Sequence, residues 1–270
     1  MTDKYVYPGT KVLINKLNIK DANKLDNAEY SIVSLNINNL IRNPILINSV
    51  KDIFVIHKLL FSDLYEWAGG KRNINIYKEE PFLAGLSVNY SDYSSINSDL
   101  NKLDKEFIKI KWDELKSKDK VEKIVSLISR LWRIHPFREG NTRTVTTFLY
   151  LFVKQIELKV NIDFIGKHAK YFRNALVMAS IDEYSEYEHL TNILMDSISL
   201  KDINENKYKT IKEYEVEKYT YQTHKIKKWW ISDDMEVIKD VGKTIIWNKI
   251  DVKVIDDDNN VGMASLYNNI

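Results

Sequence analysis

The chain has 270 residues, and its 40 lysines and arginines nearly balance 38 aspartates and glutamates, so the net charge of +2 gives no argument for nucleic acid binding. It contains no cysteine, which excludes a disulfide scaffold and a cysteine-ligated zinc site. No apolar run approaches the length of a membrane span, and the first residues begin no apolar signal segment. We therefore expect a cytoplasmic protein, while export as an effector by a signal that is not cleaved would be invisible in the sequence.

Helical periodicity dominates the first 200 residues. Apolar side chains recur at helical spacing in seven segments, at residues 23–40, 50–61, 91–110, 120–134, 142–157, 164–180 and 184–200. Asp163 is the expected N-cap of the sixth helix. The pattern predicts a mainly α domain over residues 1–205.

One strand-like segment interrupts the helical pattern. Polar and apolar residues alternate there, at Asn73, Ile74, Asn75, Ile76 and Tyr77. Residues 81–83 are again mostly apolar after a charged turn at residues 78–80, which predicts a β-hairpin. Such a hairpin either covers the core or offers an exposed edge that holds an extended peptide by backbone hydrogen bonds.

From residue 206 the composition changes. Residues 207–228 are rich in lysine and tyrosine, and shorter apolar runs follow at residues 237–238, 244–247 and 252–255. Turn-like residues separate these runs. We expect residues 206–270 to form a small α+β extension.

The residues with chemical potential gather in one short segment, residues 135–143, which reads His-Pro-Phe-Arg-Glu-Gly-Asn-Thr-Arg. Pro136 ends the preceding helix because proline disfavours helical geometry in the residue before it. The next helical pattern starts at once, so the segment is a tight loop between two helices. Gly140 allows close approach to the first N–H groups of the second helix, which form an anion site. Arg143 in that first turn suits phosphate and opposes the local helix dipole.

The other two groups of this motif loop can handle a metal and a proton. Glu139 offers the hard oxygen that Mg²⁺ prefers, and Mg²⁺ usually binds together with phosphates. His135 can accept a proton near neutral pH. Each residue alone is more often structural, but together they indicate attack by a hydroxyl on a metal-bound nucleotide phosphate.

These residues resemble the signature of the Fic family, His-x-Phe-x-Asp/Glu-Gly-Asn-Gly/Lys-Arg-x-x-Arg. Residues 7–10 (Tyr-Pro-Gly-Thr) and 65–69 (Tyr-Glu-Trp-Ala-Gly) look like two further segments of the family, so the resemblance covers roughly residues 5–200. Most members transfer AMP from ATP to a hydroxyl side chain of a target protein. The resemblance implies a Fic-type helical bundle with a β-hairpin flap at about residues 72–84.

The resemblance also implies roles for single residues. His135 would be the general base and Glu139 the Mg²⁺ ligand. Gly140, Asn141 and Thr142 would cradle the phosphates, and Arg143 would contact them. Flap residues 73–77 would dock the target. The implied partners are ATP or another nucleotide and a target protein with a Ser, Thr or Tyr hydroxyl.

Two residues depart from the family signature. Thr142 stands where Gly is usual and keeps a backbone N–H for the anion site. Thr146 replaces a second Arg and cannot contact the outer phosphate as Arg would. Two alternatives therefore stay open: the same fold transfers a different nucleotide or phosphate group, or it binds a nucleotide or peptide without transferring anything. The family's inhibitory motif, Ser/Thr-x-x-x-Glu-Gly/Asn, does not occur in the sequence, which leaves room for a separate inhibitory protein.

Overall fold

A computed structural model describes residues 3–80, 87–181, 185–199 and 208, together with the backbone of residues 243–247 and 252–256. The chain separates into two compact units. One comprises Met1–Tyr77 with Val88–Asn204, and the other comprises Lys78–Ser87 with Glu205–Ile270. The predicted domain boundary after residue 205 stays a prediction.

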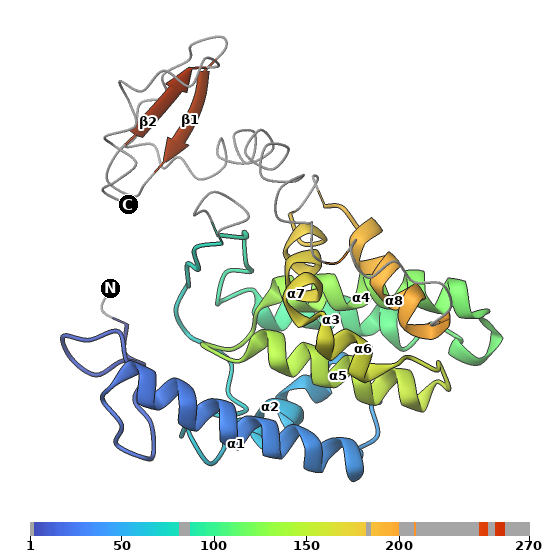
Figure 1. Ribbon diagram of the computed structural model, residues 1–270, viewed down its shortest axis with the longest axis horizontal. Coiled ribbons are helices and arrows are strands. Elements are labelled where there is room, and N and C mark those ends of the chain that lie inside the picture. The colour runs from blue at the N-terminus through green and yellow to red at the C-terminus, as the bar shows by residue number, and fades with distance from the viewer. Residues whose placement is uncertain are drawn as a thin grey trace. The chain divides into compact units, whose positions relative to one another are not determined.

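The first unit is a bundle of helices (Figure 1). Its helices are α1 (Ala22–Arg42), α2 (Ile53–Phe61), α3 (Ile96–Phe107), α4 (Ser117–Ile134), α5 (Asn141–Gln155), α6 (Ile162–Lys167), α7 (Ala169–Met178) and α8 (Glu188–Ser199). The prediction of a mainly helical domain is confirmed, and so is the position of the motif loop between two helices.

Some predicted helix bounds were wrong. The third helix begins at Ile96, five residues later than expected. The predicted sixth helix is two helices, because α6 ends before His168 and α7 begins after it. Its N-cap is Asn161 rather than Asp163, since the Asn161 side chain accepts a hydrogen bond from the Phe164 N–H.

Helices α4 and α5 form the centre of the bundle. Helix α5 packs against α1, α2 and α4, and α4 also contacts α3, α7 and α8. Val145, Phe148 and Leu149 of α5 are fully buried, and apolar side chains cover nearly its whole circumference. A helix of this kind is stable only inside a core. The motif loop is therefore anchored at both ends by buried helices.

The predicted flap hairpin is not confirmed. Residues 73–77 form no strand within the described part of the chain. The expected return segment, residues 81–83, lies outside the described residues. The alternation in the sequence is nevertheless real, because Asn73, Asn75 and Tyr77 are exposed while Ile74 and Ile76 are half-buried. Hydrogen bonds of its asparagine side chains hold this segment, as described below.

In the second unit, β1 (Lys243–Trp247) and β2 (Val252–Asp256) form an antiparallel pair with Ile245 opposite Val254. The two strands coincide with two of the predicted apolar runs. The other predictions for residues 206–270 concern residues outside the described part of the chain.

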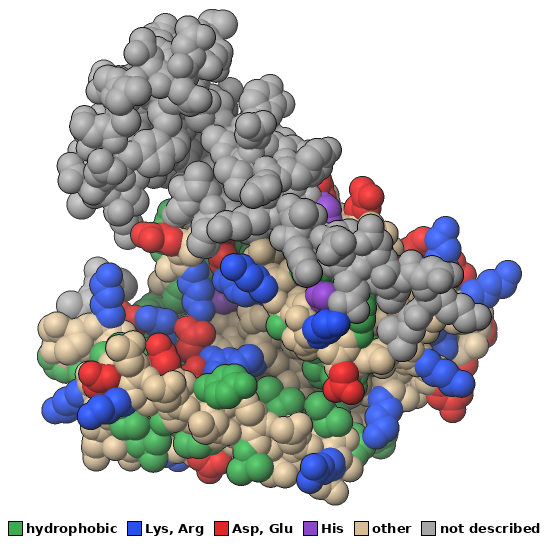
Figure 2. Space-filling model, in the orientation of Figure 1, with side chains coloured by type: hydrophobic (Ala, Val, Ile, Leu, Met, Phe, Trp, Pro, Cys, Tyr) green, Lys and Arg blue, Asp and Glu red, His purple; other side chains and the backbone are tan. Residues whose placement is uncertain are grey.

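Acidic and basic side chains intermingle on the face of the molecule shown in Figure 2, as the small net charge indicates. Among the helices that the structure describes, none has both the length and the apolar character needed to cross a membrane.

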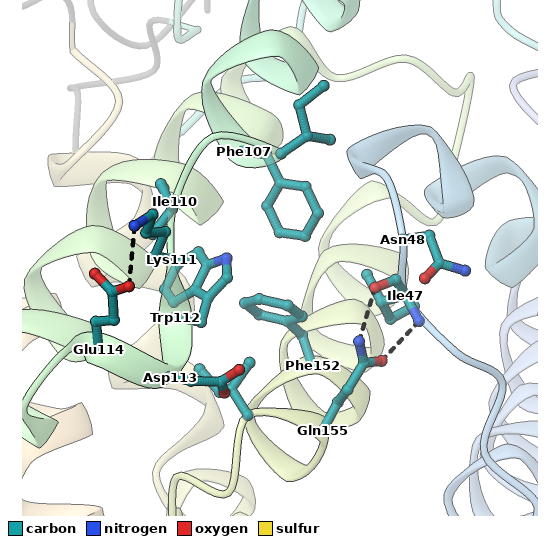
Figure 3. A pocket seen from close by; sticks show the side chains of 12 residues that line it. Ile47, Asn48, Phe107, Ile110, Lys111, Trp112, Asp113, Glu114, Phe152 and Gln155 are labelled. Atoms are coloured by element: carbon teal, nitrogen blue, oxygen red, sulfur yellow. Dashed lines mark hydrogen bonds and ion pairs between the residues drawn. The ribbon is translucent and has the colours of Figure 1, made fainter.

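A hollow of about 620 Å³ lies at the C-terminal end of α5, away from the motif loop. Phe107, Trp112 and Phe152 line it, and the Gln155 amide closes one side by pairing with both backbone groups of Ile47 (Figure 3). No residue of the motif loop takes part in this hollow.

Candidate active site

His135 ends α4 in an unusual backbone conformation. Its φ of 50° and ψ of 59° are left-handed, which is uncommon for a residue other than glycine and typical of functional sites. The imidazole is buried, and its Nδ1 lies 3.0 Å from the carbonyl oxygen of Trp132. Because a carbonyl can only accept a hydrogen bond, Nδ1 must carry the proton of the neutral ring. The basic lone pair is therefore on Nε2.

Asn141 closes the motif loop with its side chain. Its Oδ1 accepts a hydrogen bond from the Phe137 N–H at 2.9 Å, and its Nδ2 donates to the Phe137 carbonyl at 2.8 Å. The side chain is buried, and one of its amide N–H groups and its oxygen are engaged in this pair of bonds. Because burial shields the side chain, a contact of Asn141 with an anion would come from its backbone N–H.

Gly140 is the N-cap of α5 and has a φ of 80°. A Cβ atom at this position would lie 2.3 Å from the nearest ring carbon of Phe61, so only glycine fits. Its N–H donates to the Glu139 carboxylate at 2.9 Å. Within the described residues no side chain caps α5, whose first N–H groups have no partner inside the helix.

Thr142 and Arg143 both face neighbouring helices. The Thr142 hydroxyl accepts a hydrogen bond from the Trp132 indole N–H at 2.9 Å, so this departure from the family signature ties α5 to α4. Arg143 forms an ion pair with Glu29 of α1 and lies 5.0 Å above the ring of Phe61. Arg143 thus has a partner within the protein.

Glu29 also accepts a hydrogen bond from the Tyr65 hydroxyl. Burial, followed by the negative charge of Glu29, raises the pKa of Tyr65 well above its ordinary value. The phenol therefore stays protonated and acts as a donor. Tyr65, Glu29 and Arg143 form a chain of polar contacts from the residues before the flap to the first turn of α5.

A cavity of about 450 Å³ opens beside the second half of the motif loop. Glu29, Tyr65, Arg138, Glu139 and Arg143 line it together with residues of the N-terminal segment and α1. His135 is at the other end of the loop, where its ring lies 3.9 Å from that of Tyr90. The structure therefore brings Glu139 and Arg143 together at the cavity and places His135 apart from them.

The chemistry of Glu139 suits a divalent cation that arrives with phosphates. Its side chain is about one-third exposed and lies 3.9 Å from Arg143 at the cavity. Magnesium is usually held by one or two carboxylates together with substrate oxygens and water. The described residues contain no cluster of three or more side chains that could hold a metal ion.

His57 is a buried residue to which sequence reasoning gave no role. Its ring stacks between Phe61 and Phe137, with centroid distances of 4.6 and 3.8 Å. The Gly69 N–H donates to Nδ1 at 2.8 Å, so Nε2 carries the proton and donates to the Glu139 carbonyl at 3.1 Å. Burial lowers the pKa of His57 to about 4. A histidine inside an apolar helix was the available signal, because a buried ring needs polar partners.

The expected target-docking segment, residues 73–77, is attached through its asparagines. Asn73 accepts a hydrogen bond from the Tyr5 hydroxyl at 3.1 Å. Asn75 donates to Asp92 at 2.7 Å and accepts from the Tyr93 N–H at 2.9 Å. Within the described residues, the backbone groups of residues 73, 75 and 76 form no hydrogen bond.

The chain is similar in sequence to proteins of one known family. A sequence model of the Fic/DOC family matches residues 48–153. The "Probable protein adenylyltransferase y4lH" of Sinorhizobium fredii is 32% identical over 154 residues, which cover 56% of this chain and 76% of that protein. The "Probable protein adenylyltransferase Fic" of Escherichia coli is 27% identical over 139 residues, 52% of this chain and 66% of that protein.

The "Protein adenylyltransferase VbhT" of Bartonella schoenbuchensis is 27% identical over 195 residues, which are 72% of this chain but only 38% of that longer protein. Among solved structures, the BepC protein of Bartonella tribocorum with bound AMPPNP has a TM-score of 0.60 at 24% identity. That match covers 72% of this chain and 95% of the solved chain, and it shows the fold.

Proposed function

Because the chain belongs to the Fic/DOC family, we propose that it transfers AMP from ATP to a hydroxyl group of a target protein. The observation that carries the proposal is the hydrogen bond between His135 Nδ1 and the Trp132 carbonyl. It fixes the tautomer in which Nε2 can accept a proton, and an orienting bond of this kind is typical of catalytic histidines. The names of the relatives and the cavity beside Glu139 support the same reading.

In the proposed reaction, a Ser, Thr or Tyr hydroxyl oxygen attacks the α-phosphorus of ATP. The new O–P bond forms as the bond from that phosphorus to the bridging β-phosphate oxygen breaks, and pyrophosphate leaves with the electron pair. His135 Nε2 accepts the hydroxyl proton. The N–H groups that begin α5, together with Arg143, stabilise the phosphate oxygens on which negative charge accumulates.

Glu139 is the residue that would hold Mg²⁺ beside this anion site. A bound Mg²⁺ would neutralise charge on the nucleotide phosphates. The Glu139 carboxylate is held by the Gly140 N–H, and its carbonyl is held by His57. The protein thus holds both the side chain and the backbone of Glu139 before any ligand binds.

Residues 73–77 would receive the target. Their exposed polar side chains alternate with half-buried isoleucines, and most of their backbone groups have no partner in the described residues. An extended target segment could pair with this backbone, whatever its own side chains. Docking by backbone would leave the choice of target to a few side-chain contacts.

The test is mass spectrometry of a cell lysate incubated with the purified protein, Mg²⁺ and ATP. We expect an AMP adduct on a hydroxyl side chain with the wild type and none with His135→Ala. His189→Gln is the matched control, because it removes an imidazole of α8 that pairs with Tyr171 of α7 and takes no part in the motif loop or the cavity beside it. Equal labelling by His135→Ala would contradict the role of this histidine.

Thr142 and Thr146 favour a second candidate, transfer of another nucleotide or a phosphate group. Repeating the incubation with GTP, CTP and UTP decides between donors, because the adduct mass identifies the group transferred. Tight nucleotide binding without any adduct would instead identify a binding module.

A further inference from the structure

Arg72 directly precedes the docking segment in sequence and contacts the start of the motif loop. It is 1% exposed, among the most buried large side chains of the protein. Its backbone N–H donates to the Pro136 carbonyl at 2.7 Å, and its Nε donates to the His135 carbonyl at 2.8 Å. Two consecutive carbonyls of the motif loop are thus bound by one residue.

The other end of the guanidinium binds the docking segment and the chain that runs beside it. One terminal nitrogen donates to the Ile74 carbonyl at 2.8 Å and lies 3.5 Å from the Asn75 amide oxygen. The other donates to the Ser91 carbonyl. Asn75 in turn forms hydrogen bonds with Asp92 and Tyr93. It therefore keeps the Ile74 carbonyl close to the Ser91 carbonyl, and Arg72 binds both.

We propose that Arg72 is a positioning residue that fixes the proton-accepting His135 relative to the segment that presents the target hydroxyl. The proposal rests on the proposed transfer reaction and names a specific determinant of its geometry. The carbonyl that Arg72 binds belongs to His135 itself, whose left-handed backbone requires support from its surroundings. Without this hydrogen bond the His135 ring would take several positions, and its Nε2 would seldom lie within hydrogen-bond distance of the target hydroxyl.

The chemistry of the side chain explains why arginine occupies this position. A guanidinium carries five N–H groups in a rigid plane, and here three of its nitrogens point to carbonyls from three separate parts of the chain. A buried cation is costly unless its hydrogen bonds are satisfied. Lysine has the same charge, but its three N–H groups radiate from one nitrogen and cannot match carbonyls spaced around a planar guanidinium.

The test therefore compares wild type with Arg72→Lys, which keeps the charge and loses the planar fork. Isotope-labelled histidine and NMR report the tautomer and environment of the His135 ring, with His135→Ala used for assignment. Labelling rates at saturating ATP report turnover, and calorimetry reports ATP affinity. Arg130→Lys is the matched control, because Arg130 lies on α4, the helix that ends at His135, and pairs with Glu106 at the surface.

For Arg72→Lys we expect displaced His135 signals and a labelling rate about 10- to 100-fold lower, since misplacing a reacting group by about 1 Å can cost this much. ATP affinity should change less than about threefold, because Arg72 touches neither Glu139 nor Arg143. Arg130→Lys should leave all three measurements unchanged. Unchanged His135 signals in a folded Arg72→Lys protein would overturn the proposal.

If Arg72→Lys does not fold, Asn75→Ala tests the proposal by the same NMR measurement. Asn75 is exposed, and its loss loosens the Ile74 and Ser91 acceptors without opening the core. Displaced His135 signals in this variant support the coupling, and unchanged signals overturn it. The NMR measurement does not depend on transfer. If the variants displace the His135 signals but the wild type labels no protein, the proposed function is disproved and the positioning role stays in place.

Discussion

Acidification should weaken the fold through His57, because this buried ring is bound as a neutral tautomer. In the structure Nδ1 accepts from the Gly69 N–H while Nε2 donates to the Glu139 carbonyl. Adding a proton to Nδ1 places two donors opposite each other and charges a ring held between Phe61 and Phe137. The native state therefore resists protonation.

The size of the effect follows from the pKa of His57, which burial lowers from 6.5 to about 4. Below pH 6.5 the unfolded chain binds a proton that the folded chain refuses, so the free energy of unfolding falls with the pH. The contribution is complete above pH 6.5 and is lost as the pH falls to about 4. A gap of roughly 2.5 pKa units corresponds to about 3 kcal/mol.

Urea unfolding at several pH values between about 7 and 4 measures this contribution, with His57→Asn as the reference. The Asn side chain can still accept from Gly69 but does not titrate, so subtracting the two curves removes the effect of the carboxylates. We expect the stability advantage of the wild type to shrink by about 3 kcal/mol over this range. A difference that stays constant with pH would refute the assignment of the neutral tautomer.

Three further substitutions test the candidate site. Gly140→Ala combines a left-handed φ with overlap on Phe61 and should lower the free energy of unfolding by about 2–5 kcal/mol in urea unfolding. Gly166→Ala, inside α6 with open space around it, should leave the free energy of unfolding unchanged or raise it by up to about 1 kcal/mol. Glu29→Gln removes the charge that holds Arg143 and should tighten ATP about 3- to 10-fold in calorimetry; unchanged or weaker binding would mean that Arg143 does not reach the phosphates. Thr146→Arg should tighten ATP roughly 10- to 100-fold and ADP much less, and an equal effect on both nucleotides would point to a donor other than ATP.

Much of the helical fold could be predicted because local patterns determine it. Helices α4 and α5 carry apolar residues at helical spacing, and Pro136 and Gly140 mark where the chain must leave and re-enter a helix. The break at His168 could not be predicted, because α6 and α7 share one continuous apolar pattern. The hairpin prediction is not confirmed, because its expected return segment lies outside the described residues. Alternation at residues 73–77 requires one buried and one exposed face, and it does not require a partner strand.

The candidate site was predictable where its residues are neighbours in sequence. His135, Glu139, Gly140 and Arg143 lie within nine positions, so one loop carries all four, with Glu139 and Arg143 at the cavity and His135 at the other end. Their supports were not predictable, because His57, Arg72 and Glu29 come from distant segments and single residues of these types are usually surface groups. Asn141 shows the limit within the loop itself, since its side chain serves the Phe137 backbone and leaves only an N–H for a ligand.

In the proposed reaction, the absence of the second motif arginine would give Arg143 a larger share in nucleotide binding than the family signature assigns to it. Of the two signature arginines only Arg143 remains, and in the structure it is bound to Glu29. Phosphates must therefore compete with that carboxylate for the same guanidinium, while Glu139 lies 3.9 Å from it on the other side. Glu29 is buried and Arg143 is about one-third exposed, so breaking this ion pair has a cost, which a nucleotide with several negative charges can offset. Nucleotide binding would accordingly release Arg143 from Glu29 of α1. Through this contact, the position of α1 and the occupancy of the nucleotide site would influence each other.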